Sequence, residues 1–194
     1  MRKLVLGILS VLVTGVLIYS WWGASRKPSY DKPEQIEQKI KVVVAEEIII
    51  PDGWSDTYNF TLNNVGTGSV FSLSEFAGKV VIVDFWATWC PPCRQQVPVF
   101  NALYEQYQSE GLEIVGVSLD RDGVEGVTKF MEQYEIKYTV VMGNEEIISK
   151  YGGISGIPTA FIIDKSGNIS KKHVGYESFE VFEGEIKELL SVKS

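Results

Sequence analysis

From residue 58 onward, short runs of β-branched and aromatic residues alternate with longer stretches of helical periodicity. Residues 79–87 and 112–119 are continuous apolar runs, which predicts two buried strands. Further strands are predicted over residues 58–62, 70–73, 138–142, 159–164 and 169–175, and helices over residues 91–108, 124–135, 144–151 and 178–192. The last two strands are separated by the sequence Lys-Ser-Gly-Asn, which suits a hairpin.

This order of elements predicts an α/β fold, because strands that alternate with helices form a parallel sheet with helices on both faces. The terminal hairpin adds antiparallel strands, so we expect a mixed central sheet. The strands at 58–62 and 70–73 precede the alternation, and we expect them to pair with each other.

Residues 4–22 form an uncharged apolar segment of 19 residues. As a helix it would be about 28 Å long, close to the ~30 Å hydrocarbon core of a bilayer. Arg2 and Lys3 precede it, which favours an N-terminus on the inside, and Trp21 and Trp22 stand at its far end, where aromatic side chains meet the membrane surface. We expect a single-pass anchor in the cytoplasmic membrane, with the rest of the chain outside the cytoplasm in the periplasm.

A cleaved signal peptide is the alternative, with Gly23-Ala24-Ser25 as a possible cleavage site, and it would leave a secreted or periplasmic protein. A buried core helix fits less well, since apolar residues surround the whole segment rather than one side. The expected organisation is therefore a membrane anchor or signal segment at 1–27, a tether at 28–55 and one domain at 56–194.

Charge excludes one class of partner. The 194 residues carry a formal net charge of −7, and the first 27 contain four basic residues and no acidic one, which leaves −7 − 4 = −11 for the remainder. Because so acidic a body repels phosphate backbones, nucleic acid is not an expected partner.

The two cysteines, Cys90 and Cys93, stand three positions apart at the predicted start of a helix. So short a loop restrains the unfolded chain very little, which argues against a structural disulfide. The unpaired N–H groups of a helix N-terminus favour a thiolate, so Cys90 is expected to attack a disulfide and Cys93 to resolve the mixed disulfide. Pro91 and Pro92 fix the first helical turn between them.

A Cys-x-x-Cys pair is also half of a zinc site, but zinc needs about four ligands and only His173 remains as a further Cys or His. No metal and no cofactor are therefore expected. A copper-handling module would use the same sulfurs with His173, although that histidine is expected to be an exposed residue of an edge strand.

Asp84 lies within the most apolar strand, six residues before Cys90. Strand alternation places it on one face with Trp86 and Thr88. Burial would raise the pKa of Asp84, so its carboxylate could take the proton of Cys93 and is a candidate catalytic residue with the two cysteines. The alternative is a structural ion pair with Lys79.

The sequence Gly-Ile-Pro-Thr at residues 156–159 immediately precedes a predicted strand. A cis bond before Pro158, facing Cys90, would leave the backbone of Ile157 free to bind an extended substrate. Together with Trp89 and Pro91 beside the first cysteine, these two residues are the candidate substrate-binding residues.

These motifs resemble a known family. The run Val-Asp-Phe-Trp-Ala-Thr-Trp-Cys-Pro-Pro-Cys at 83–93 resembles the active-site segment of thioredoxin, Pro98 matches its helix-kinking proline, and 156–159 matches its cis-proline loop. Residues 60–62, 71–79 and 114–120, with the helical insert that follows, are similar to the TlpA/ResA branch. The resemblance covers roughly residues 56–192 and implies a thioredoxin fold with an extra N-terminal strand pair and a helical insert.

The resemblance also implies a function: an exported, often membrane-tethered enzyme that reduces protein disulfides and is recharged by a membrane-embedded thiol donor. Some members reduce apocytochrome c during cytochrome c maturation. This chain departs from the branch at Asp84, where Asn is frequent, and at Gln96, where Glu is frequent. A thiol peroxidase of the peroxiredoxin type is one alternative, although its Pro-x-x-x-Thr-x-x-Cys motif is absent, and a copper-handling module is the second.

Overall fold

The structure is a computed structural model, and it describes residues 54–192. The predicted anchor at residues 4–22 and nearly all of the predicted tether at 28–55 lie outside the described residues. Within the described part, no helix is both long enough and apolar enough to cross a membrane.

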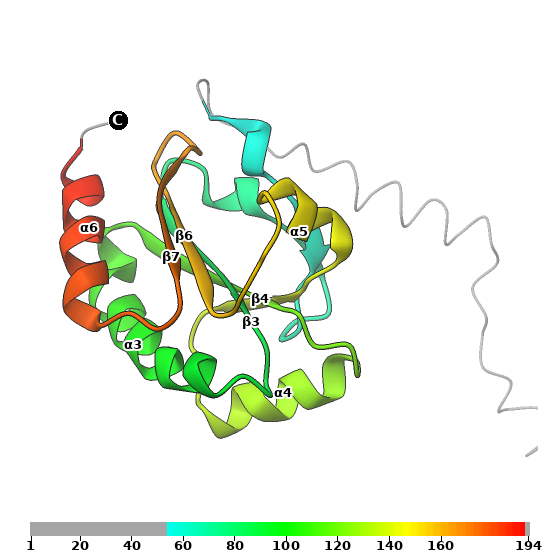
Figure 1. The fold of residues 1–194 in the computed structure, drawn as a ribbon. Helices are drawn as coiled ribbons and strands as arrows, with labels where there is room; N and C mark the ends of the chain where they lie inside the picture. Colours follow the sequence, from blue (N-terminus) through cyan, green and yellow to red (C-terminus); the bar gives the residue numbers. More distant parts are fainter. Residues whose placement is uncertain (1–53, 193–194) are drawn as a thin grey trace, which may run out of the picture. The chain divides into compact units, whose positions relative to one another are not determined.

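The central sheet has five strands in the order β5-β4-β3-β6-β7 (Figure 1). Their bounds are Val80–Trp86 for β3, Leu112–Ser118 for β4, Thr139–Met142 for β5, Thr159–Ile163 for β6 and Ile169–Val174 for β7. Strands β3, β4 and β5 run parallel, whereas β6 is antiparallel to both β3 and β7. The predicted mixed sheet is confirmed.

Strand β3 is the centre of the domain, and all seven of its residues are buried. Its side chains alternate between two apolar clusters, with Ile82 and Trp86 in one and Val81 and Phe85 in the other. Both faces of the strand therefore need cover, which explains its unbroken apolar sequence.

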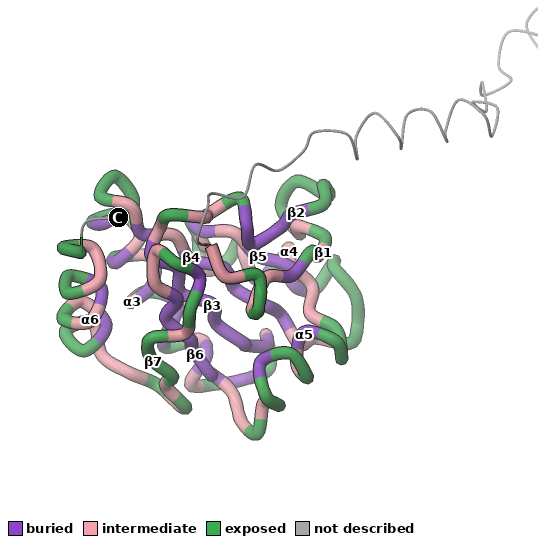
Figure 2. The backbone as a smooth tube through the Cα atoms, turned by 90° about the horizontal axis from the view of Figure 1, so that it is seen from above, coloured by how far each residue is buried: buried purple, intermediate pink, exposed green. Residues whose placement is uncertain are grey.

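Four helices provide that cover. They are α3 (Pro91–Tyr107), α4 (Val124–Gln133), α5 (Glu145–Lys150) and α6 (Phe179–Ser191). Phe100 of α3, Phe130 of α4 and Phe182 of α6 belong to one cluster, whereas Ile147 of α5 belongs to the other. Helices lie on both faces as predicted (Figures 1 and 2), and each helix bound agrees with the sequence expectation within two residues.

The expected N-terminal strand pair is present as β1 (Thr61–Asn63) and β2 (Val70–Ser72), which form a separate antiparallel sheet. Its predicted start at residue 58 was wrong, because Asp56–Tyr58 form a short 3₁₀ turn. The hydroxyl of Tyr151 donates to the carbonyl of Tyr58 at 3.0 Å, so tertiary contacts hold this carbonyl outside a strand ladder.

Candidate active site

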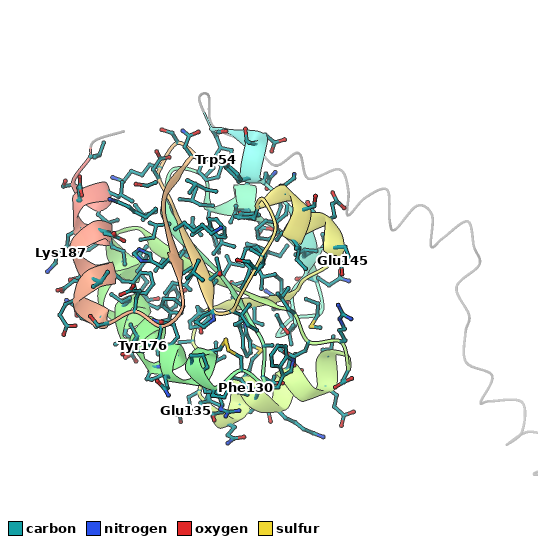
Figure 3. All side chains as sticks on the ribbon, viewed as in Figure 1. Trp54, Phe130, Glu135, Glu145, Tyr176 and Lys187 are labelled. Atoms are coloured by element: carbon teal, nitrogen blue, oxygen red, sulfur yellow. A yellow bond between two sulfur atoms is a disulfide. The ribbon has the colours of Figure 1, made fainter. Side chains whose placement is uncertain are left out.

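Cys90 and Cys93 are joined by a disulfide at the start of α3 (Figure 3). Cys90 is the N-cap, and its Sγ accepts the backbone N–H of Cys93 at 3.2 Å. Pro91 and Pro92 occupy the first two helical positions, where a missing N–H costs least. The two cysteines are equally buried, at 3% and 2% exposure, so the helix N–H on Cys90 is what favours a thiolate there.

A cis peptide bond joins Ile157 to Pro158, as the sequence predicted. The carbonyl oxygen of Ile157 lies 3.7 Å from Sγ of Cys90, so this loop faces the disulfide. The backbone N–H of Gly175 donates to the carbonyl of Pro158 at 2.8 Å and ties the loop to the end of β7. Trp89 is 64% exposed beside the disulfide. Cys90 therefore follows an exposed tryptophan in the chain and faces the cis-proline loop.

Asp84 is buried in β3, at 3% exposure. Burial raises the pKa of its carboxyl to about 8, and no hydrogen-bond partner lies at Oδ1 among the described residues. Asp84 lies opposite Gly116 in the sheet. Burial, and to a smaller extent the charge of Asp84, raises the pKa of Tyr138. Lys79 pairs with Glu113 instead, so the expected alternative of a Lys79–Asp84 ion pair was wrong.

Asp120 is a residue of this region that the sequence analysis missed. Its carboxylate accepts the backbone N–H of Thr88 at 2.9 Å, the hydroxyl of Thr88 at 2.5 Å and the hydroxyl of Ser118 at 2.8 Å. The sequence does contain a pattern that predicts this contact. Thr88 lies two residues after the end of β3, and Asp120 lies two residues after the end of β4, the parallel strand beside it. The loop that carries Trp89 and Cys90 is thereby fixed to the end of β4.

A family model described as Redoxin matches residues 56–190. The chain belongs to the redoxin family. The thiol-disulfide oxidoreductase ResA of Bacillus thuringiensis (strain Al Hakam) is 34% identical over 132 residues, which is 68% of this chain and 75% of that relative. The ResA of Bacillus subtilis (strain 168) is 33% identical over 121 residues, or 62% of this chain and 66% of that relative.

A solved structure agrees with these relatives. The thioredoxin-family thiol:disulfide interchange protein of Chlorobium tepidum TLS is 37% identical, with a TM-score of 0.64 over 69% of this chain and 94% of the other. With the Cys90–Cys93 pair, these likenesses show that this redoxin is a thiol-disulfide oxidoreductase with a thioredoxin fold.

Gln96 occupies the position at which the TlpA/ResA branch, which this chain resembles, often carries Glu. It is 1% exposed, one helical turn beyond Cys93. Its side-chain amide accepts the backbone N–H of Glu177 at 2.9 Å and donates to the carbonyl of Glu177 at 3.2 Å. In this redoxin the residue therefore joins α3 to the segment before α6.

His173 does not have the environment that the sequence suggested. Its side chain is only 14% exposed, and Nε2 lies 2.8 Å from the carboxylate of Glu185. The ring also makes an edge contact with Phe182. The expectation of an exposed histidine was wrong because α6 packs beside β7 and covers it. Across residues 54–192, no three His, Cys, Asp or Glu side chains are grouped as ligands of a metal ion.

Proposed function

We propose that this redoxin reduces protein disulfides outside the cytoplasm, anchored by residues 4–22 with its N-terminus inside. The observation that carries the proposal is the position of Cys90. Its Sγ receives a helix N–H and stands 3.7 Å from the Ile157 carbonyl, beside an exposed Trp89. A stabilised nucleophile beside free backbone and an exposed aromatic ring suits attack on the disulfide of another protein.

The reaction begins with the reduced dithiol. The Cys90 thiolate attacks one substrate sulfur, the substrate S–S bond breaks, and the second substrate sulfur leaves as a thiolate that takes a proton from water. The Cys93 thiol then gives its proton to the Asp84 carboxylate and attacks Sγ of Cys90, which releases the first substrate sulfur. The Cys90–Cys93 disulfide remains, and a membrane-embedded dithiol donor reduces it again.

Trapping the intermediate tests this order. In the full chain, Cys93→Ser should accumulate a mixed disulfide with a protein substrate, and Cys90→Ser should accumulate none. Insulin is the first substrate, and oxidised apocytochrome c is the second, because cytochrome c maturation is the narrower role that the resemblance implies. A trapped adduct with insulin but none with apocytochrome c would restrict the proposal to general protein-disulfide reduction.

Two further measurements address the direction of electron flow and the location. A reduction potential of the Cys90–Cys93 pair near or below about −250 mV supports a reductase, whereas a value near −120 mV indicates an oxidant. Membrane-impermeant thiol reagents applied to intact cells should label the reduced dithiol if the domain is outside. Labelling only after lysis would contradict the proposed location.

A further inference from the structure

Two buried polar atoms on one face of β3 have no hydrogen-bond partner among residues 54–192. They are Oδ1 of Asp84 and Nε1 of Trp86, in side chains that are only 3% and 2% exposed. The two residues stand two positions apart in the strand, so both side chains point toward the cluster covered by α3, α4 and α6. One atom is an acceptor and the other is a donor, and leaving either of them unpaired inside a protein is costly.

Gly116 of β4 brings these two atoms toward each other. It lies directly opposite Asp84 in the parallel strand pair, about 4.8 Å away at the usual strand spacing. A Cβ at position 116 would lie 2.8 Å from Nε1 of Trp86, so the indole nitrogen occupies the place where a side chain would begin. The donor of Trp86 therefore lies beside the carboxyl of Asp84, across a residue that has no side chain.

The other neighbours of Asp84 do not compete for this place. Ala160 of β6, its partner on the second side, has no polar side chain. Trp54 carries another buried indole nitrogen without a partner, but it packs against the opposite cluster. In the part of the chain that the structure describes, Trp86 is thus the one buried side-chain donor that is unpaired on the Asp84 face of the sheet.

The titratable groups on the Asp84 face of the sheet are Cys93 of α3, Tyr138 before β5 and His173 of β7. Cys93 does not titrate in the oxidised protein, because it is in the disulfide. Burial, and to a smaller extent the charge of Asp84, raises the pKa of Tyr138, so its hydroxyl stays protonated. His173 lies two strand spacings from Asp84, about 10 Å, and its ring nitrogens face Glu177 and Glu185. The ionisation of Asp84 can therefore be followed in the oxidised protein with no thiol titrating beside it.

We infer that the indole N–H of Trp86 donates a hydrogen bond to the carboxylate of Asp84 once that group ionises, which makes Trp86 a positioning residue of the dithiol reaction. The bond favours the charged form of Asp84, because a charged acceptor receives a stronger hydrogen bond than a neutral one. It also fixes the carboxylate while Cys93 transfers its proton. The inference rests on the proposed function, in which Asp84 accepts that proton.

The first test is nuclear magnetic resonance of the oxidised full chain in detergent, with ¹³C at the aspartate carboxyls and ¹⁵N at the indoles. The five tryptophans give five indole N–H signals, and Trp86→Phe and Asp84→Asn identify the two groups. In the unmodified protein, the Trp86 signal should move with pH at the same midpoint as the Asp84 carboxyl, and it should stop moving in Asp84→Asn. Trp86→Phe should raise the midpoint of Asp84 by about one pH unit.

The matched control is Trp54→Phe, which removes the other unpaired indole N–H and should leave the midpoint of Asp84 unchanged. Phe at position 86 keeps an aromatic ring against Phe130, which is labelled in Figure 3, so the variant retains its packing. The titration of the indole signal in the unmodified protein needs no change at this position.

The second test follows the proton transfer itself. Dithiobis(nitrobenzoate) releases one coloured thiolate when Cys90 of the reduced protein attacks it, and a second when Cys93 resolves the mixed disulfide. In stopped flow, Trp86→Phe should slow the second release roughly tenfold at pH 7 and much less at pH 10, where Asp84 is ionised in both proteins. Equal slowing at both pH values would overturn the inference, because it would place the effect on the packing of the site.

The magnetic resonance outcomes are read without turnover. A Trp86 signal that does not respond to the ionisation of Asp84 would overturn the inference, as would an unchanged Asp84 midpoint in Trp86→Phe. A larger shift of that midpoint in Tyr138→Phe than in Trp86→Phe would also overturn it, because the phenol would then be the donor. Failure of the unmodified protein to reduce insulin would instead refute the proposed function.

Discussion

Thr88 donates both its backbone N–H and its hydroxyl to the carboxylate of Asp120, 32 residues further along the chain. The backbone N–H of Leu119 donates to the carbonyl of Trp86 at 2.8 Å in the same region. The turn between β3 and α3 is therefore attached to the end of β4 at three points. Cys90 follows this turn, so its place at the helix start depends on contacts from a neighbouring strand.

Replacing Asp120 by Asn should lower the free energy of unfolding by about 1–3 kcal/mol, because an amide offers one acceptor oxygen where the carboxylate offers two. Urea unfolding measures the loss. Thr88→Val removes only the hydroxyl, and its effect should be much smaller in the Asp120→Asn background than alone. The control is Asp122→Asn, an exposed neighbour that should leave stability unchanged. Additive losses in the double variant would show that the two residues do not act together.

Asp84→Asn should slow reduction of insulin near neutral pH by about tenfold or more, because Cys93 would lose its proton acceptor. With the pKa of Asp84 at about 8, the carboxylate fraction rises between pH 6 and 9, and the wild-type rate of mixed-disulfide resolution should rise with it. The variant should lack that rise. Stopped-flow measurement of the resolution step over this pH range checks both, and an unchanged rate in the variant would refute the proton role.

The same substitution should make the protein more stable at neutral pH. The folded Asp84 carboxyl has a pKa near 8 against 3.8 for the free group, so the folded state binds more protons between these values and loses stability as pH rises through them. Asn carries no such penalty. We expect Asp84→Asn to raise the free energy of unfolding by a few kcal/mol at pH 7 and to make little difference near pH 3.5. If Asp84→Asn changed the free energy of unfolding by the same amount at both pH values, that result would contradict the burial of an ionisable carboxyl at this position.

The positions of Asp84 and Pro158 were predictable because each is determined by its place along a strand or at a strand start. A strand period assigns the face, and a short motif identifies the loop. The surroundings of His173 were not predictable, since they depend on how α6 crosses β7, which no local pattern specifies. The same holds for Gln96, whose partner Glu177 is 81 residues away.

Gln96→Glu should destabilise this protein by about 1–3 kcal/mol at neutral pH, although Glu is frequent there in the branch it resembles. A carboxylate could still accept the N–H of Glu177, but it could not donate to the carbonyl of Glu177, and it would be buried at a position only 1% exposed. Burial would raise the pKa of the new carboxyl, so the loss should shrink as pH falls and the group becomes a donor again. Urea unfolding at pH 7.5 and pH 4.5 measures the difference. The control is Gln95→Glu, which makes the same change at the exposed neighbouring position and should cost little. An equal effect at both positions would show that the pair of hydrogen bonds to Glu177 does not hold α3 in place.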